Sequence, residues 1–128
     1  MALMDSQAIE TASAPPPLGL YSQALRCGDT IYVSGQLPID PATGKIVEGG
    51  IREQTRQLFA NLRAIVEAAG SSMRRVVKVT IFLNDWNDFA AFNEVYAEQF
   101  ERPYPTRSTI QNFRPMGALV GADVIALS

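Results

Sequence analysis

The sequence predicts an α+β fold in which two helices lie on one face of a mixed β-sheet. Three observations support this prediction. Apolar residues recur at helical spacing in two segments, alternating or β-branched segments surround them, and clusters of Gly, Pro, Asn and Asp separate the segments. The resulting order is ββ-α-β-α-ββ. At 128 residues, the chain is long enough for one hydrophobic core and too short for two.

The N-terminal part predicts a tail followed by a hairpin. Residues 1–17 show little periodicity and end in three prolines, so we expect a mobile or extended tail. Tyr21–Cys27 and Thr30–Ser34 flank a Gly28-Asp29 pair, which favours a two-residue β-turn. A second turn cluster, ending at Lys45, leads to a short extended segment.

Two segments predict helices. The first begins after Gly49-Gly50 and ends before Gly70, a residue type common just past helix C-termini. The second begins at capping residues between 84 and 88 and ends near Phe100. We expect their apolar residues to form the core, because aromatic bulk at this spacing usually packs there. These residues are Ile51, Leu58, Phe59, Leu62, Ile65, Val66 and Ala69 in the first helix, and Phe89, Phe92, Tyr96 and Phe100 in the second.

A strand is predicted between the helices and another at the C-terminus. Val76–Leu83 alternates, so its residues at positions 77, 79, 81 and 83 are expected on one face. The final strand, Ala118–Leu127, has one charge, Asp123, in an otherwise apolar run. Burying an unpaired carboxylate is costly. Two interpretations stay open: an edge strand with Asp123 in water, which is the commoner case, or a strand in which Asp123 has a partner.

The stretch Pro103–Gln111 passes from a turn into a strand. Its two prolines disfavour helix, and Thr106–Ile110 has the β-branched content of a strand. Arg107 lies near the start of that strand, where a guanidinium can hold an anionic ligand. Its position alone does not distinguish this role from a solvated or surface-paired arginine. A turn at 114–117 follows.

The composition argues against several classes of protein. The formal net charge is −2, which does not favour an extended nucleic-acid surface. Cys27 is the single cysteine, so an intrachain disulfide is impossible and a reducing compartment is expected. The sequence contains no apolar run of about 18 residues and no basic, apolar leader, so we expect a cytoplasmic protein without a membrane span.

Histidine is absent, and this restricts the chemistry. Ser-His and Cys-His nucleophile pairs are excluded, as are the common histidine metal sites. Proton transfer near neutral pH would need a carboxylate of raised pKa, a tyrosine, the lone thiol, or water held by backbone groups. No dinucleotide fingerprint, P-loop or paired-cysteine motif is present, so neither a metal nor a nucleotide cofactor is expected.

Several short motifs occur from about residue 18 to 126, and their order and spacing are specific although each motif alone is weak evidence. They are Leu18–Ala24, Val33–Pro38, Gln54–Gln57 with Asn61-Leu62, Ala68–Gly70, Asn87–Ala90 with Asn93 and Tyr96, Pro105–Thr109, and Gly117–Val120. Together these motifs resemble the RidA/YjgF/UK114 family of reactive-intermediate deaminases.

The resemblance implies that residues 18–128 form a single chorismate-mutase-like α+β domain, assembled as a homotrimer with ligand clefts between subunits. The implied activity is hydrolysis of enamines or imines released by pyridoxal-phosphate enzymes, giving a 2-oxo acid and ammonia without cofactor or metal. Arg107 matches the catalytic and substrate-binding arginine that grips the substrate carboxylate. The other matching cleft positions are Tyr21, Ser34, Gly35 and Asn93. A guanidinium suits a carboxylate because its planar donor fork matches the two oxygens.

One departure concerns the final strand, where the family commonly has a glutamate thought to orient water. Gly121 stands at that position in this sequence. Asp123 matches a second family glutamate, about 7 Å further along on the same strand face, and is a candidate for water or polar support instead of a simple substitute. This change leaves other functions open. They are deamination of a larger, 2-aminomuconate-type enamine, and a non-catalytic trimer that binds small carboxylates. The family has also carried a ribonuclease label, but the acidic balance and the absence of histidine disfavour RNA as a substrate.

Overall fold

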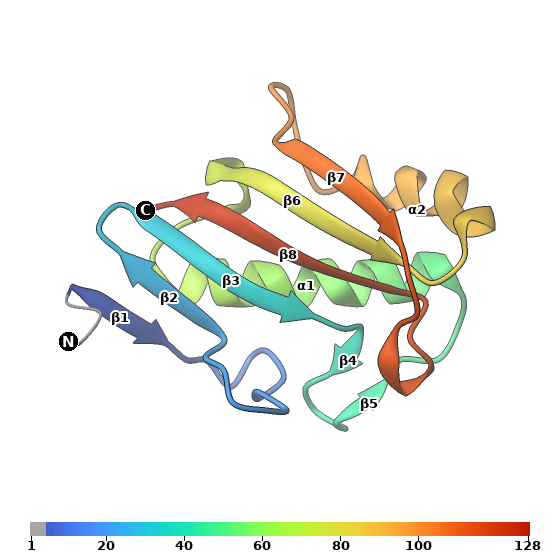
Figure 1. Cartoon of the computed structure of the whole chain (residues 1–128), viewed down its shortest axis with the longest axis horizontal. Helices are drawn as coiled ribbons and strands as arrows, with labels where there is room; N and C mark the ends of the chain where they lie inside the picture. The colour runs from blue at the N-terminus through green and yellow to red at the C-terminus, as the bar shows by residue number, and fades with distance from the viewer. Residues whose placement is uncertain (1–4) are drawn as a thin grey trace.

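A computed structural model describes residues 5–128, which fold around one mixed sheet (Figure 1). The sheet contains six strands in the order β1-β2-β3-β8-β6-β7, and β4 and β5 form a separate two-stranded ribbon. Short 3-10 turns lie at Met73–Arg75, Trp86–Asp88 and Pro115–Gly117. The elements are β1 (Ser6–Ile9), β2 (Ala24–Cys27), β3 (Thr30–Gln36), β4 (Ile39–Asp40), β5 (Lys45–Ile46), α1 (Ile51–Ala68), β6 (Val76–Leu83), α2 (Phe89–Tyr96), β7 (Thr106–Gln111) and β8 (Val120–Leu127).

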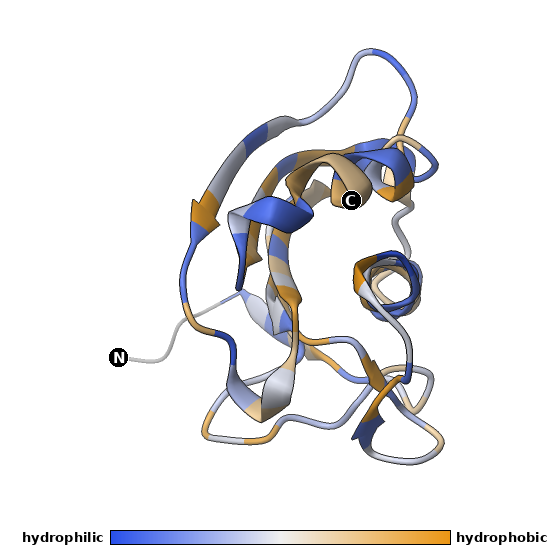
Figure 2. Ribbon diagram, turned by 90° about the vertical axis from the view of Figure 1, so that its right-hand side faces the viewer, coloured by the Kyte–Doolittle hydropathy of each residue, from blue (hydrophilic) through white to orange (hydrophobic). Residues whose placement is uncertain are grey.

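The sheet is mixed because β6 and β7 are parallel while the other neighbouring strands are antiparallel. The chain between β6 and β7 contains α2, as a parallel crossover requires. Both helices lie on one face: α1 runs behind the sheet in Figure 1, and Figure 2 shows it nearly end-on beside the sheet. The predicted fold class and mixed sheet are confirmed, and the predicted order holds from α1 onward, whereas within residues 5–128 five strands precede α1 instead of two.

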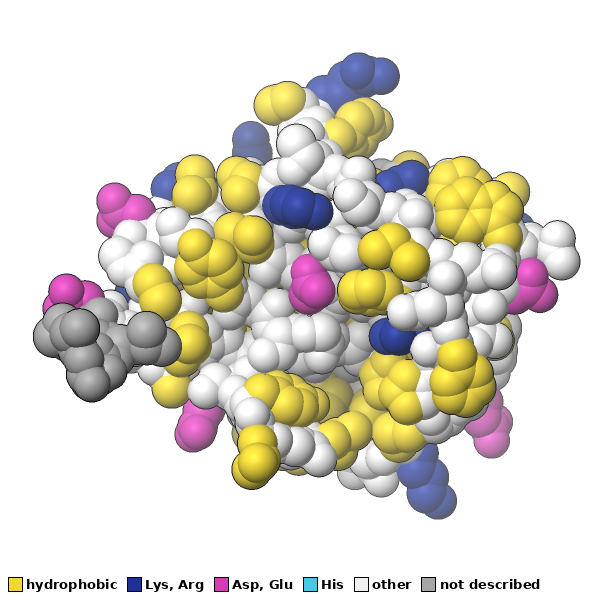
Figure 3. Space-filling view, viewed as in Figure 1, with side chains coloured by type: hydrophobic (Ala, Val, Ile, Leu, Met, Phe, Trp, Pro, Cys, Tyr) yellow, Lys and Arg dark blue, Asp and Glu magenta, His cyan; other side chains and the backbone are white. Residues whose placement is uncertain are grey.

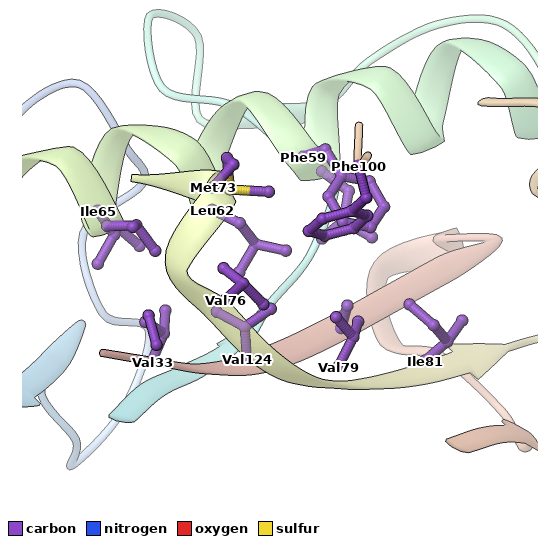
Figure 4. Packing of buried hydrophobic residues seen from close by; sticks show 14 of the residues in the cluster. Val33, Phe59, Leu62, Ile65, Met73, Val76, Val79, Ile81, Phe100 and Val124 are labelled. Carbon is purple, nitrogen blue, oxygen red and sulfur yellow. The ribbon is translucent and has the colours of Figure 1, made fainter. Parts of the chain in front are cut away.

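The hydrophobic core lies between the helices and this face of the sheet (Figure 4). Helix α1 contributes the apolar stripe that its periodicity predicts, and Phe59 is fully buried. Phe59 makes edge-to-face contacts with Tyr96 and Phe100, each at 5.8 Å between ring centroids. The aromatic residues of the second predicted helix are therefore core residues, with Phe89 packed at its margin. Among residues 5–128, no helix combines the length and apolarity needed to cross a membrane.

The N-terminal segment differs from the predicted tail. Ser6–Ile9 pairs with β2, and Ile9 and Ala14 are buried. The buried side chain of Gln23 accepts from the backbone N–H of Thr11 at 2.8 Å and donates to the Pro15 carbonyl at 2.8 Å. The folded domain therefore includes residues 6–17, because partners distant in sequence satisfy the backbone of this segment. Residues 1–4 of the predicted tail lie outside the described residues.

Two local features also differ from the sequence prediction: the face that Val77 occupies in β6, and the residue at which α2 ends. A β-bulge in β6 inserts Val77 between Val76 and Lys78, so Val77 is 40% exposed while Val76 is buried. The alternating face therefore holds from 79 to 83 but not at 77. Helix α2 ends at Tyr96 instead of near Phe100, and tighter turns carry the chain onward to bury Phe100 beside Phe59.

Candidate functional site

The structure places the predicted site residues in two separate cavities of the single chain. Arg107 and Asn93 line a cavity of about 290 Å³ beside α2, which we call the Arg107 site. Tyr21, Ser34 and Gly35 line a larger cavity of about 610 Å³, which we call the Tyr21 pocket. The two cavities share no lining residue. One subunit therefore contains two parts of the predicted site and does not bring them together.

The two cavities belong to different faces of the sheet. Arg107 pairs with Val79, a fully buried residue of the helix-covered face, so its side chain lies beside α2. Phe82, which lines the Tyr21 pocket, pairs with Gly121 on the helix-free face. Figure 3 views the molecule from that side, where yellow apolar side chains surround a mostly white area with one magenta acidic side chain and dark blue basic side chains near it.

The guanidinium of Arg107 is held by an amide and by aromatic rings. Its Nη1 donates to Asn93 Oδ1 at 2.9 Å. Its central carbon lies 4.6 Å from the Tyr96 ring centroid, and 5.7 and 5.8 Å from those of Phe89 and Phe92. Burial raises the pKa of the Tyr96 phenol, although the Arg107 charge acts in the opposite direction. Arg107 therefore rests on neutral rings, which attract a cation without neutralising it.

Arg107 remains available for an anion. Its side chain is half-buried on the edge strand β7, and no carboxylate of residues 5–128 forms an ion pair with it. A held guanidinium loses little further side-chain freedom when it binds a carboxylate through its donor fork. The Arg107 site thus presents an oriented, positively charged guanidinium, which Asn93 holds by a hydrogen bond.

A bulge in β3 shapes the Tyr21 pocket. Val33 pairs with Val124 and Gln36 with Ala122, so Ser34 and Gly35 lie at an irregularity of the ladder. Such bulges redirect side chains and occur often beside active sites. An added Cβ at Gly35 would meet no heavy atom within 4 Å, so a side chain at this position would extend into open space.

Two hydroxyl groups line the Tyr21 pocket. Ser34 Oγ donates to the Ser22 carbonyl at 2.6 Å, which leaves its lone pairs free to accept. The Tyr21 hydroxyl accepts from the Leu18 N–H at 3.1 Å and keeps its own proton for donation. These two hydroxyls can therefore offer one donor and one acceptor to water or to a polar ligand.

Arg114 lies beside the space that a side chain at position 121 would enter. A Cβ built on Gly121 would lie 3.1 Å from the Gln36 carbonyl oxygen and 3.3 Å from Arg114 Nη1. Arg114 also lines the Tyr21 pocket. Sequence reasoning assigned Arg114 only to a turn and missed it as a site residue. A small residue in a strand close to an arginine in the preceding loop was the available signal.

Asp123 lies on a central strand, so the edge-strand interpretation is wrong. Strand β8 is flanked by β3 and β6, and Asp123 pairs with Thr80. Burial raises the pKa of the Asp123 carboxyl above its usual 3.8, while Thr80 and the Lys78 ammonium oppose that change. Asp123 does not line the Tyr21 pocket, and its partners support the alternative interpretation.

We expect Asp123→Asn to stabilise the protein at pH 7. The folded protein binds the Asp123 proton more tightly than the unfolded chain, so its contribution is most favourable below pH 3.8 and falls as pH rises through the folded-state pKa. The neutral amide removes that dependence. Urea midpoints of both proteins at pH 4 and pH 7 test this, with the exposed Glu101→Gln as control. A lower midpoint for Asp123→Asn at pH 7 would contradict it.

Metal binding has no support in the geometry of the described part of the chain. No group of three or more cysteine and carboxylate side chains is placed to hold an ion among residues 5–128. Cys27 is exposed at the end of β2. The polar side chains that line the two cavities are those of Tyr21, Ser34, Gln36 and Arg114 in one, and Asn93, Tyr96, Tyr104 and Arg107 in the other.

Comparison with known proteins extends over almost the whole chain. A family model described as Endoribonuclease L-PSP matches residues 11–127. A RutC family protein from Pyrococcus horikoshii is 49% identical over 121 residues, covering 94% of this chain and 96% of the relative. A protein from Dermatophagoides farinae named 2-iminobutanoate/2-iminopropanoate deaminase is 48% identical over 102 residues, covering 80% of each chain.

Solved structures agree in fold. The crystal structure of RidA from an Antarctic Psychrobacter bacterium superposes with a TM-score of 0.92 at 43% identity, covering 95% of this chain and 99% of that one. With the family-model match and the identity of the relatives, this likeness shows that the chain belongs to the RidA/YjgF/UK114 family.

Proposed function

We propose that this protein hydrolyses 2-imino acids, and the enamines in equilibrium with them, to 2-oxo acids and ammonia. The observation that carries the proposal is the preorganised guanidinium of Arg107, which forms no ion pair with any carboxylate of residues 5–128. The 2-iminobutanoate/2-iminopropanoate deaminase name of the 48% identical relative supports the same reaction.

We further propose that the reaction takes place between subunits of a homotrimer. Within one chain, Arg107 and the Tyr21 pocket lie on different faces of the sheet. Arg107 lies on the edge strand β7, where it is open to a neighbouring copy. A second copy that places its Tyr21 pocket against this edge completes a cleft containing all five predicted residues.

In this cleft, Arg107 holds the α-carboxylate and thereby orients the C=N bond. Water adds to C2, a proton is transferred to nitrogen, and the resulting carbinolamine releases ammonia as its C=O bond forms. An imine is already electrophilic, so orientation and a positioned water supply most of the required catalysis. Tyr21 and Ser34 are placed to hold that water, because one hydroxyl retains a donor and the other retains acceptor capacity.

A non-catalytic carboxylate-binding trimer is the second candidate. The observation that favours it is Gly121: this position has no carboxylate to orient water, and Arg114 Nη1 lies 3.3 Å from where a Cβ would stand. The two candidates differ in turnover and not in binding. An amino-acid oxidase or threonine dehydratase releases the imine, and semicarbazide traps what remains. Wild-type protein is expected to reduce the trapped fraction, and an unchanged fraction would exclude the deaminase.

Mixed assemblies test whether the two cavities combine across subunits. Arg107→Ala removes one half of the site, and Gly35→Leu fills the other. We expect each variant alone to be inactive, whereas co-expression restores part of the activity. In hybrid trimers, some clefts combine Arg107 of one subunit with an open Tyr21 pocket of another. The measurement is imine turnover by co-purified protein carrying two different tags.

The control for this experiment is co-expression of each variant with a differently tagged copy of itself. Activity in the mixed sample equal to that control would show that both halves act within one chain. Light scattering of the wild type is expected to give three times the chain mass of 14.0 kDa. A monomer would contradict the proposed cleft.

A further inference from the structure

Arg114 places a positive charge in the Tyr21 pocket. It is the only charged residue among those that line the cavity in the described part of the chain. No carboxylate of residues 5–128 forms an ion pair with it, since the ion pairs found there join Arg52 to Glu94 and Arg56 to Glu98. The pocket therefore offers a cation and no anion of its own.

Arg114 is held in this position by its own loop and by an aromatic ring. Its backbone N–H donates to Asn84 Oδ1 at 3.2 Å, and its Nε donates to the Phe113 carbonyl at 3.1 Å. Its central carbon lies 4.8 Å from the Phe82 ring centroid. These contacts use one edge and one face of the guanidinium and leave the two terminal nitrogens as donors.

The absence of a side chain at Gly121 leaves room for the Arg114 guanidinium. Arg114 Nη1 lies 3.3 Å from where a Cβ at 121 would stand, so a larger residue would displace the guanidinium or pair with it. A glutamate at 121 would give this part of the pocket a negative group. With glycine at 121 and arginine at 114, this part of the pocket carries a positive group instead.

We propose that Arg114 is a second anion-binding residue, and that the site takes 2-imino acids carrying a second carboxylate at the far end of an apolar spacer. The inference rests on the proposed function, in which Arg107 of a neighbouring subunit holds the first carboxylate. The other pocket residues suit the spacer, because Leu37, Ile39, Phe82 and Met116 are apolar. A neutral ligand filling the same space would cover the guanidinium without pairing it, which is unfavourable.

Binding of stable 2-oxo acids tests the ligand class without depending on turnover. Calorimetry compares 2-oxopentanoate with 2-oxoglutarate, and 2-oxohexanoate with 2-oxoadipate, so that carbon number is matched within each pair. Wild-type protein is expected to bind the dicarboxylate of at least one pair about 10- to 100-fold more tightly, the range of one charge-assisted hydrogen bond. Arg114→Gln is expected to remove that preference and to leave monocarboxylate binding within about threefold.

Two further variants test whether the dicarboxylate preference depends on the charge at Arg114. Arg74→Gln makes the same charge change at an exposed arginine away from the Tyr21 pocket and is expected to keep the preference. Gly121→Glu places a carboxylate beside Arg114 and is expected to abolish the preference while Arg114 is still present. If the wild type binds both members of both pairs equally, or if Arg114→Gln weakens both members equally, Arg114 does not recognise a second carboxylate.

Turnover of the imines of the same acids separates this inference from the proposed function. Oxidases acting on glutamate and norvaline release the five-carbon imines. Arg114-dependent turnover of the dicarboxylic imine supports both proposals. Arg114-dependent binding of the dicarboxylic 2-oxo acid without any imine turnover supports the ligand class and rejects the deaminase. Turnover with no dicarboxylate preference in binding or rate supports the deaminase and overturns the role of Arg114.

Discussion

Arg107→Ala is expected to lower kcat/KM for 2-imino acid hydrolysis by about 100-fold or more. The guanidinium can donate two charge-assisted hydrogen bonds to the substrate carboxylate, and each contributes about 1.5–3 kcal/mol. Every 1.36 kcal/mol of lost transition-state stabilisation is about tenfold in rate. The aromatic rings and Asn93 that hold Arg107 make these bonds effective, because the side chain is already oriented.

Arg107→Lys is the matched variant for this prediction. Lysine keeps the positive charge but replaces the planar fork by a single ammonium, so we expect an intermediate loss of about tenfold. Initial rates at several imine concentrations, generated by an amino-acid oxidase, supply KM and kcat separately. A rise in KM with little change in kcat would indicate that Arg107 binds substrate and transition state equally. Equal rates for wild type and Arg107→Ala would reject Arg107 as the carboxylate anchor.

Phe59→Ala is expected to destabilise the protein by about 3–5 kcal/mol, the usual cost of truncating a buried aromatic residue. Phe59 is fully buried and packs edge-to-face against Tyr96 of α2 and Phe100 beyond it. Its removal leaves a cavity between the two helices. Because Tyr96 also lies against Arg107, we expect loss of activity to follow the loss of structure.

Denaturant unfolding at matched protein concentration measures this effect, because association would couple stability to concentration. Phe59→Leu keeps most of the apolar volume and is expected to cost less than the alanine variant. A surface change such as Arg74→Gln serves as the reference and should leave the midpoint almost unchanged. A midpoint for Phe59→Ala within error of the wild type would contradict the central place of this residue in the core.

Much of the fold was predictable from local sequence because its signals are local. The stripe on α1, the Gly28-Asp29 turn and the alternation from Val79 to Leu83 each reflect the geometry of one helix, one hairpin or one strand. The family resemblance also selected Arg107 as the candidate carboxylate-binding arginine. These conclusions required no knowledge of which segments meet in space.

Other features of the fold could not be predicted because they depend on contacts between segments that are distant in sequence. Residues 6–17 contain no strong local pattern, and they are folded because β2 and the Gln23 side chain supply partners from further along the chain. Asp123 was assigned to an edge because its own strand does not reveal its neighbours. Its carboxyl instead lies near Thr80 and Lys78, since β8 is inserted between β3 and β6.

The sequence by itself determined the fold class, the family and the identity of the carboxylate-binding candidate. Only the tertiary structure decided that Arg107 and the Tyr21 pocket lie on different faces of the sheet, and that Arg114 fills the space beside Gly121. The reason is physical. Periodicity and turn-forming residues reflect the geometry of a single segment. The charge and shape of a site depend instead on side chains from different segments, which the strand order of the sheet brings together.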